Sequence, residues 1–110
     1  MNTKPFTSYT RIREYAERWT WIDPVTRLRK RGHVVPSGVI NPERVPFSLL
    51  AVSEKGHKIE GEVVCISVLP QKGMRRVKFV ADCGRHKKDD IIWVCDKLII
   101  EIDGVRFVTH

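Results

Sequence analysis

Clusters of positively charged side chains are the residues of this chain whose types and spacing most clearly indicate a chemical role. The first cluster comprises Arg27, Arg29, Lys30 and Arg31. The second lies within residues 71–88 and comprises Lys72, Arg75, Arg76, Lys78, Arg85, Lys87 and Lys88. Cations along one surface bind phosphates, and most of the affinity comes from counterion release. Arginine outnumbers lysine in the first cluster, and its forked guanidinium suits bidentate phosphate contact.

The charge of the whole chain supports the same interpretation. Its 20 Lys/Arg and 13 Asp/Glu give a net charge of +7, which favours encounters with polyanions. Single-stranded nucleic acid also needs aromatic platforms for its bases, and Trp21 is the candidate for this role. Trp19, Phe79 and Trp93 are expected to be structural. DNA or RNA is therefore the predicted partner, although no base-reading motif indicates sequence-specific binding.

The cysteines and histidines offer one possible metal site. Cys83 and His86 have the C-x-x-H spacing that can place a thiolate and an imidazole on one ion, with Cys95 as a third ligand. Structural zinc sites present two close ligand pairs, and here only one pair exists, so no metal or other cofactor is predicted. Three cysteines without a secretory signal or membrane-spanning run predict a cytoplasmic protein that neither enters nor crosses a membrane.

No catalytic arrangement accompanies these residues. A nucleophilic Cys83 with His86 as its base lacks a third group to orient the pair. The chain also has no Gly-rich phosphate loop, nucleophile elbow or paired-metal pattern. The sequence therefore favours a non-catalytic nucleic-acid-binding protein over an enzyme. The alternative is a protein-interaction or assembly module, such as an accessory subunit or homo-oligomer, in which an acidic C-terminal hairpin contacts a basic face.

A β-hairpin near the C-terminus is the clearest structural signal. Asp-Gly at 103–104 between two apolar runs predicts a type I′ turn, since both central residues of that turn need positive φ. The turn pairs Ile102 with Val105 and Ile100 with Phe107. This register places those apolar side chains on one buried face.

Further apolar runs predict strands at 47–52, 59–69, 75–82 and 91–95. The second and third of these form a hairpin that pairs Ile66 with Val77 and Val64 with Phe79. The same register turns the basic residues of the third strand, Lys78 among them, toward solvent. The short apolar run at 91–95 is expected to be largely buried.

The N-terminal half predicts one helix and a long loop. Apolar residues Ile12, Tyr15, Ala16 and Trp19 recur at helical spacing, which predicts an amphipathic helix over 9–19. Frequent Pro and Gly residues make 32–46 a loop, with a short strand at 33–35. The chain is therefore predicted to be a single, mainly β (α+β) domain over 1–110. Residues 47–110 would form a small SH3-like or OB-like antiparallel barrel, with the helix packed on it.

Overall fold

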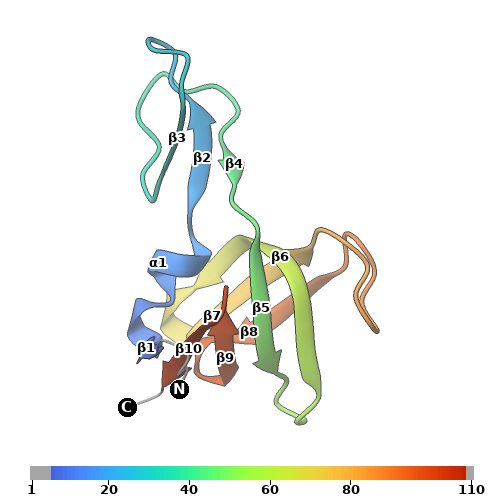
Figure 1. The fold of residues 1–110 in the computed structure, drawn as a ribbon. Helices are drawn as coiled ribbons and strands as arrows, with labels where there is room; N and C mark the ends of the chain where they lie inside the picture. Colours follow the sequence, from blue (N-terminus) through green and yellow to red (C-terminus); the bar gives the residue numbers. More distant parts are fainter. Residues whose placement is uncertain (1–5, 109–110) are drawn as a thin grey trace, which may run out of the picture.

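A curled β-sheet forms the body of the chain (Figure 1). The computed structural model describes residues 6–108. In chain order the strands of this sheet are β1 (Phe6–Ser8), β5 (Phe47–Val52), β6 (Lys58–Leu69), β7 (Met74–Phe79), β8 (Ile91–Cys95), β9 (Ile99–Ile102) and β10 (Val105–Val108). Their order across the sheet is β1-β10-β9-β5-β6-β7-β8, and only β1 and β10 pair in parallel. The prediction of a mainly β protein is confirmed.

The sheet has two ends, β1 and β8, so the predicted closed barrel is not found among the described residues. It nevertheless curls around one core. Alternate residues of each central strand point inward, as in Phe47, Leu49 and Ala51 of β5. The remaining buried apolar side chains come from neighbouring strands and the N-terminal helix: Ile12, Ala16, Ile59, Val63, Cys65, Val77, Phe79, Val94, Ile99, Ile102 and Phe107. Burial of these apolar surfaces is the main stabilising contribution to the fold.

The β6–β7 pairing follows the predicted register next to the turn, where Ser67 lies opposite Arg76, and differs from it by one residue on the other side of Ile66. Val77 lies opposite Cys65 instead of Ile66, and Phe79 lies opposite Val63. The cause is a β-bulge at Ile66, which adds one residue to β6 and turns the following side chains to the other face. Cys65 is therefore fully buried, and burial raises the pKa of its thiol.

The C-terminal hairpin is confirmed at its turn. Ile102 pairs with Val105, and both residues at 103–104 have positive φ (51° and 82°), as the Asp-Gly pair predicts. Ile99 and Ile102 are the buried positions of β9, however, and Ile100 is only partly buried. The β9–β5 register shifts at Ile100, because Leu50 pairs with Glu101 and Ala51 pairs with Ile99, and this irregularity turns Ile99 inward.

The predicted helix over 9–19 is confirmed only in part, as two short helical turns within 9–16. A 3₁₀ turn η1 (Tyr9–Arg11) leads into a single helical turn, α1 (Arg13–Ala16). Ile12 and Ala16 are buried in the core, as their spacing indicates. The helix ends at Glu17, and Trp19 begins a strand. No helix of residues 6–108 is long and apolar enough to span a membrane.

A three-stranded arm projects from the sheet and was not predicted (Figure 1). It consists of β2 (Trp19–Ile22), β3 (Arg29–Gly32) and β4 (Glu43–Arg44), in the order β3-β2-β4. The short strand expected at 33–35 lies instead at β3. At the base of the arm, Val45 N donates to Arg18 O at 2.9 Å, so the chain leaves and re-enters the body side by side.

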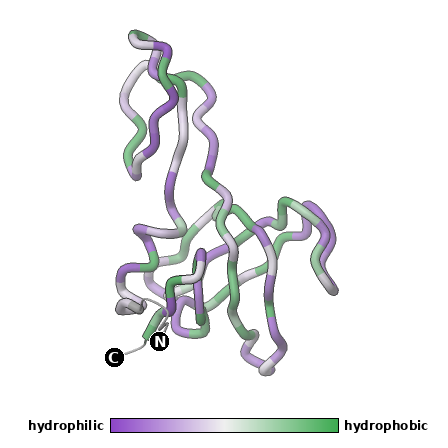
Figure 2. The backbone as a smooth tube through the Cα atoms, in the orientation of Figure 1, coloured by the Kyte–Doolittle hydropathy of each residue, from purple (hydrophilic) through white to green (hydrophobic). Residues whose placement is uncertain are grey.

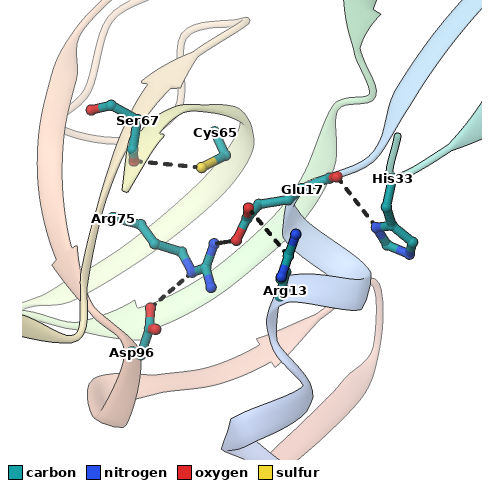
Figure 3. A network of polar contacts seen from close by, with 7 residues as sticks. All are labelled: Arg13, Glu17, His33, Cys65, Ser67, Arg75 and Asp96. Atoms are coloured by element: carbon teal, nitrogen blue, oxygen red, sulfur yellow. Dashed lines mark hydrogen bonds and ion pairs between the residues drawn. The ribbon is translucent and has the colours of Figure 1, made fainter. Parts of the chain in front are cut away.

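Arg75 is buried on the inner side of β7 and joins three parts of the chain (Figure 3). Its side chain is only 6% exposed, and its Nη1 donates to Glu17 at the end of α1. Its Nε donates to Asp96 Oδ1 at 2.9 Å, in the 3₁₀ turn η3 (Asp96–Leu98) between β8 and β9. Arg13 approaches Glu17 at 3.8 Å from the solvent side. The N-terminal helix is thereby connected to the sheet.

The two carboxylates keep Arg75 charged in the core. Burial alone would lower the pKa of Arg75, but the hydrogen bond to Glu17 and the charges of Asp96 and Glu17 raise it above its ordinary value. Burial raises the pKa of Asp96, against the opposing effect of the Arg75 charge. Desolvation of all three groups therefore has a cost, and removal of one partner leaves uncompensated buried charge.

Substitution of Arg75 tests this network. We expect Arg75→Met to lower the free energy of unfolding by about 3–5 kcal/mol, because Asp96 loses its cation and Glu17 keeps only the more distant Arg13. The adjacent Arg76→Met removes an outward-facing cation and should cost less than about 1 kcal/mol. Urea denaturation followed by circular dichroism measures both. A triple variant that adds Glu17→Gln and Asp96→Asn to Arg75→Met should recover much of the lost free energy of unfolding. Equal losses in Arg75→Met and Arg76→Met would contradict the network.

Candidate nucleic-acid interface

The first predicted basic cluster lies on the arm. Arg29, Lys30 and Arg31 form most of β3, Arg27 lies in the turn before it, and all four are exposed. Figure 2 shows this strand as a hydrophilic stretch of the projecting arm. Side chains alternate along a strand, so Arg29 and Arg31 share one face, and Arg29 donates to Thr20 Oγ1 on β2 at 3.2 Å.

The tip of the arm, residues 23–28, is an ordered turn. Asp23 Oδ1 accepts hydrogen bonds from Val25 N at 2.8 Å and Thr26 N at 3.4 Å. Asp23 N donates to Leu28 O at 2.8 Å, and Arg27 N donates to Asp23 O at 2.9 Å. Asp23 also pairs with the Lys30 ammonium at 3.1 Å. Together these contacts fix the turn.

Apolar side chains surround the arginines at this tip. Val25 is 87% exposed, Leu28 63% and Ile22 44%. Arg27 adopts a left-handed conformation (φ 63°), which is uncommon for a residue with a Cβ. The tip thus presents apolar groups and an arginine to solvent together.

Trp21, the candidate platform for base stacking, is buried. It is 6% exposed, and its ring packs so close to Gly32 that a Cβ there would lie 3.1 Å from Trp21 Cη2. Trp19 is half-buried on the same strand, with the Arg44 guanidinium 3.9 Å from its ring centroid. The buried Trp21 ring is therefore not open to base stacking, and Arg44 covers one face of the Trp19 ring.

The second cluster is divided by the sheet. Arg76 is exposed and Lys78 partly exposed on the outer side of β7, whereas Arg75 is buried and cannot contact phosphate. Trp93 lies opposite Arg76, with the guanidinium 5.6 Å from its ring centroid.

Trp93 lies on the surface, although the sequence predicts a structural role for it. The expectation that 91–95 would be largely buried is wrong, because Trp93 is 44% exposed and only Val94 of β8 is fully buried. Phe79, by contrast, is fully buried as expected. Because all five residues are apolar, the sequence does not show which of them point inward and which point outward on this edge strand.

The remaining cations of this cluster lie in turns. The 80–90 loop is held by Asp90 Oδ2, which accepts from Lys87 N at 2.8 Å, and by Asp82 Oδ1, which accepts from Lys88 N at 2.7 Å. Arg85, Lys87 and Lys88 are exposed on this loop. Lys72 is exposed in the 3₁₀ turn η2 (Pro70–Lys72). Figure 1 shows the arm and the 80–90 loop on different sides of the body, so the two clusters form separate surfaces.

Most of the predicted cations have no acidic partner. Within residues 6–108, ion pairs involve only Lys30 and Arg75 of the predicted set. The other ion pairs use Arg11, Arg13, Arg18 and Lys58. The unpaired cations of the predicted set therefore lie on the arm, in η2, on the outer side of β7 and in the 80–90 loop, where phosphates could replace their counterions.

Cys83 and His86 do not form a metal site with Cys95. They face each other across a short hairpin, with Cys83 N donating to His86 O at 2.8 Å and His86 N to Cys83 O at 2.9 Å. The His86 ring stacks on Phe79 at 4.4 Å between centroids. The described part of the chain contains no group of three or more His, Cys, Asp or Glu side chains placed to share an ion.

Comparison with known proteins does not assign a family, because no family model, curated protein or solved structure matches this chain significantly.

The turn at the arm tip should respond to acid. The backbone hydrogen bond from Val25 and the pairing with Lys30 lower the pKa of Asp23 below its ordinary value of 3.8. The stabilisation of the turn is therefore fully present above that value and is lost as the pH falls through the lower, folded-state pKa.

An NMR titration of the Val25 amide measures this effect directly. We expect its chemical shift to titrate with a midpoint below 3.8, as the carboxylate that accepts its hydrogen bond is protonated. In Asp23→Asn the transition should disappear. A midpoint at or above the ordinary value would contradict the described turn.

Proposed function

We propose that this chain is a non-catalytic nucleic-acid-binding protein and that the arm is its main contact surface. The observation that carries the proposal is the set of exposed, unpaired Arg27, Arg29 and Arg31 on a projecting β-ribbon. Arginine gives bidentate contacts with phosphate oxygens, and each neutralised phosphate releases counterions. Such binding needs no catalytic group.

The shape of the arm suits a groove of duplex DNA. Beyond the two-residue β4, the arm narrows to the β2–β3 ribbon and its turn. The major groove, about 12 Å wide, admits a two-stranded β-ribbon. The exposed Val25 and Leu28 at the tip are apolar groups of the kind that contact thymine methyls or unstacked bases. The basic face around Arg76 and Trp93 is a second, independent surface for the same type of ligand.

We further propose that β5 to β9 form an SH3-like core in the cytoplasm. The support for the fold is the strand order, in which β9 returns beside β5 after the β5–β6–β7–β8 meander. The support for the location is the set of three free cysteines. Such folds occur with many functions, so the binding proposal rests on the arm alone.

Charge reversal on the arm tests the proposal. Arg29→Glu with Arg31→Glu should weaken binding to labelled duplexes of every sequence, because both cations neutralise phosphates. The slope of log K against log salt should become shallower by about 1.8, since each of the two phosphates accounts for about 0.9 of that slope. Fluorescence anisotropy over a series of salt concentrations measures both effects.

Two further double variants locate the surface. Lys55→Glu with Lys97→Glu makes the same charge change at exposed positions outside both clusters and should alter the slope far less. Arg76→Glu with Lys78→Glu tests the β7 face, and an effect larger than that of the arm variant would move the main surface there. Absence of binding to duplex or single-stranded probes at low salt would refute the proposed function.

A further inference from the structure

A groove runs along the outer edge of β8, separate from the arm. Two cavities of about 410 and 230 Å³ share Ser53, His57 and Trp93 as lining residues. The larger extends toward Leu98, at the C-terminal end of β8, and the smaller toward Ile92. The groove therefore lies between β8 and the β5–β6 turn, where the curled sheet is not closed.

The backbone of β8 has an unpaired edge in this groove. Asp96 N donates to Gly73 O at 2.8 Å and Phe79 N donates to Asp90 O at 2.9 Å, so the even-numbered positions of this segment bond to β7. In an antiparallel pair, the alternate positions then direct N–H and C=O away from the partner strand. These positions are Ile91, Trp93 and Cys95, and no described strand pairs with them on that side.

The edge lacks the features that usually protect an exposed strand. Residues 91–95 contain no charge and no proline, and both Ile91 and Trp93 are exposed. Natural proteins normally protect such an edge with charge, proline, a bulge or a covering segment. An open, uncharged edge beside cavities that are partly lined by apolar side chains is an arrangement into which an extended peptide can add as a further strand.

The charges around the groove indicate the type of peptide. Lys55, Lys58 and Arg85 line it, and Glu54 is the one carboxylate among the lining residues of the two cavities. Lys55 and Arg85 have no acidic partner in the described residues. A second copy of this chain would bring the same cations, and its net charge of +7, against themselves. An acidic segment would neutralise them.

We propose that the edge of β8 binds an extended acidic segment of another protein as an additional strand. Backbone groups of the segment hydrogen-bond to Ile91, Trp93 and Cys95. Alternate side chains point to the same side of a strand, so apolar side chains at every second position can lie in the two cavities. Acidic side chains between them point toward solvent, where the long, exposed side chains of Lys55 and Arg85 at the rim can reach them.

A synthetic peptide tests this inference. The probe is a fluorescein-labelled peptide of about nine residues in which glutamate and leucine alternate. With a rise of about 3.3 Å per residue, an extended peptide of this length is longer than β8. We expect saturable binding by anisotropy. In ¹⁵N-resolved NMR, the amides of Ile91, Trp93 and Cys95 should shift and gain exchange protection more than those of Ile92 and Val94.

Matched controls separate this site from the arm. Methylation of alternate backbone nitrogens of the probe should weaken binding about tenfold or more, since the edge hydrogen bonds are lost. Lys55→Glu with Arg85→Glu should weaken it by about tenfold. Arg29→Glu with Arg31→Glu should leave peptide binding unchanged while weakening nucleic-acid binding, so the two proposals can fail separately.

Several outcomes would overturn the peptide site. If a probe with lysine in place of glutamate binds as tightly as the original peptide, the cations do not select an acidic segment. If the methylated probe binds as tightly, the peptide does not hydrogen-bond to the edge of β8. Concentration-dependent dimerisation with the same amides shifting in the absence of peptide would assign the edge to a second copy. Displacement of the bound peptide by duplex DNA that persists in Arg76→Glu with Lys78→Glu would assign the groove to nucleic acid.

Discussion

The buried Arg75 is the interaction on which the positions of the other elements depend. It contacts Glu17, after which the chain leaves the body to form the arm, and Asp96, where β8 turns toward β9. The Glu17 carbonyl oxygen also lies 3.3 Å from His33 Nδ1, on the segment that follows β3 (Figure 3). One desolvated guanidinium therefore fixes the α1 turn, the inner side of β7 and the base of the arm together. Such a group contributes specificity of arrangement more than net stability.

The ion pairs of the chain divide its charges into two populations. Carboxylates pair with the cations that hold elements together, as in Arg75 with Glu17 and Arg18 with Asp103. The cations of residues 27–31 and of the outer β7 face have no ion-pair partner among the described residues, apart from Lys30. Contact with phosphates would order these long side chains at some cost in conformational entropy, and the release of counterions would offset that cost. The same separation leaves the apolar edge of β8 free of the arm, so one small domain presents two chemically different surfaces.

The sequence predicts those parts of the fold that rest on local chemistry. An Asp-Gly pair requires a tight turn whatever surrounds it, and the apolar runs of β5, β6 and β7 need a buried face. Three features lack such a local signal. The strand Arg29–Gly32 has no apolar side chain, and its pairing with β2 is visible only in three dimensions. The bulge at Ile66 changes which side chains of β6 point inward, and no glycine in the sequence signals its position. Arg75 and Arg76 are adjacent cations, and only the register decides which of them is buried.

The most direct test of the account is a map of the chain's backbone amides by ¹⁵N-resolved NMR during addition of a short DNA duplex at low salt. Binding through the arm predicts that the largest shifts lie between Ile22 and Arg31, with smaller changes around Arg76 and none in the buried Arg75 network. A protein whose arm amides are unchanged at saturation, or whose spectrum shows no response to the duplex, would contradict the assignment of the arm as a nucleic-acid contact surface.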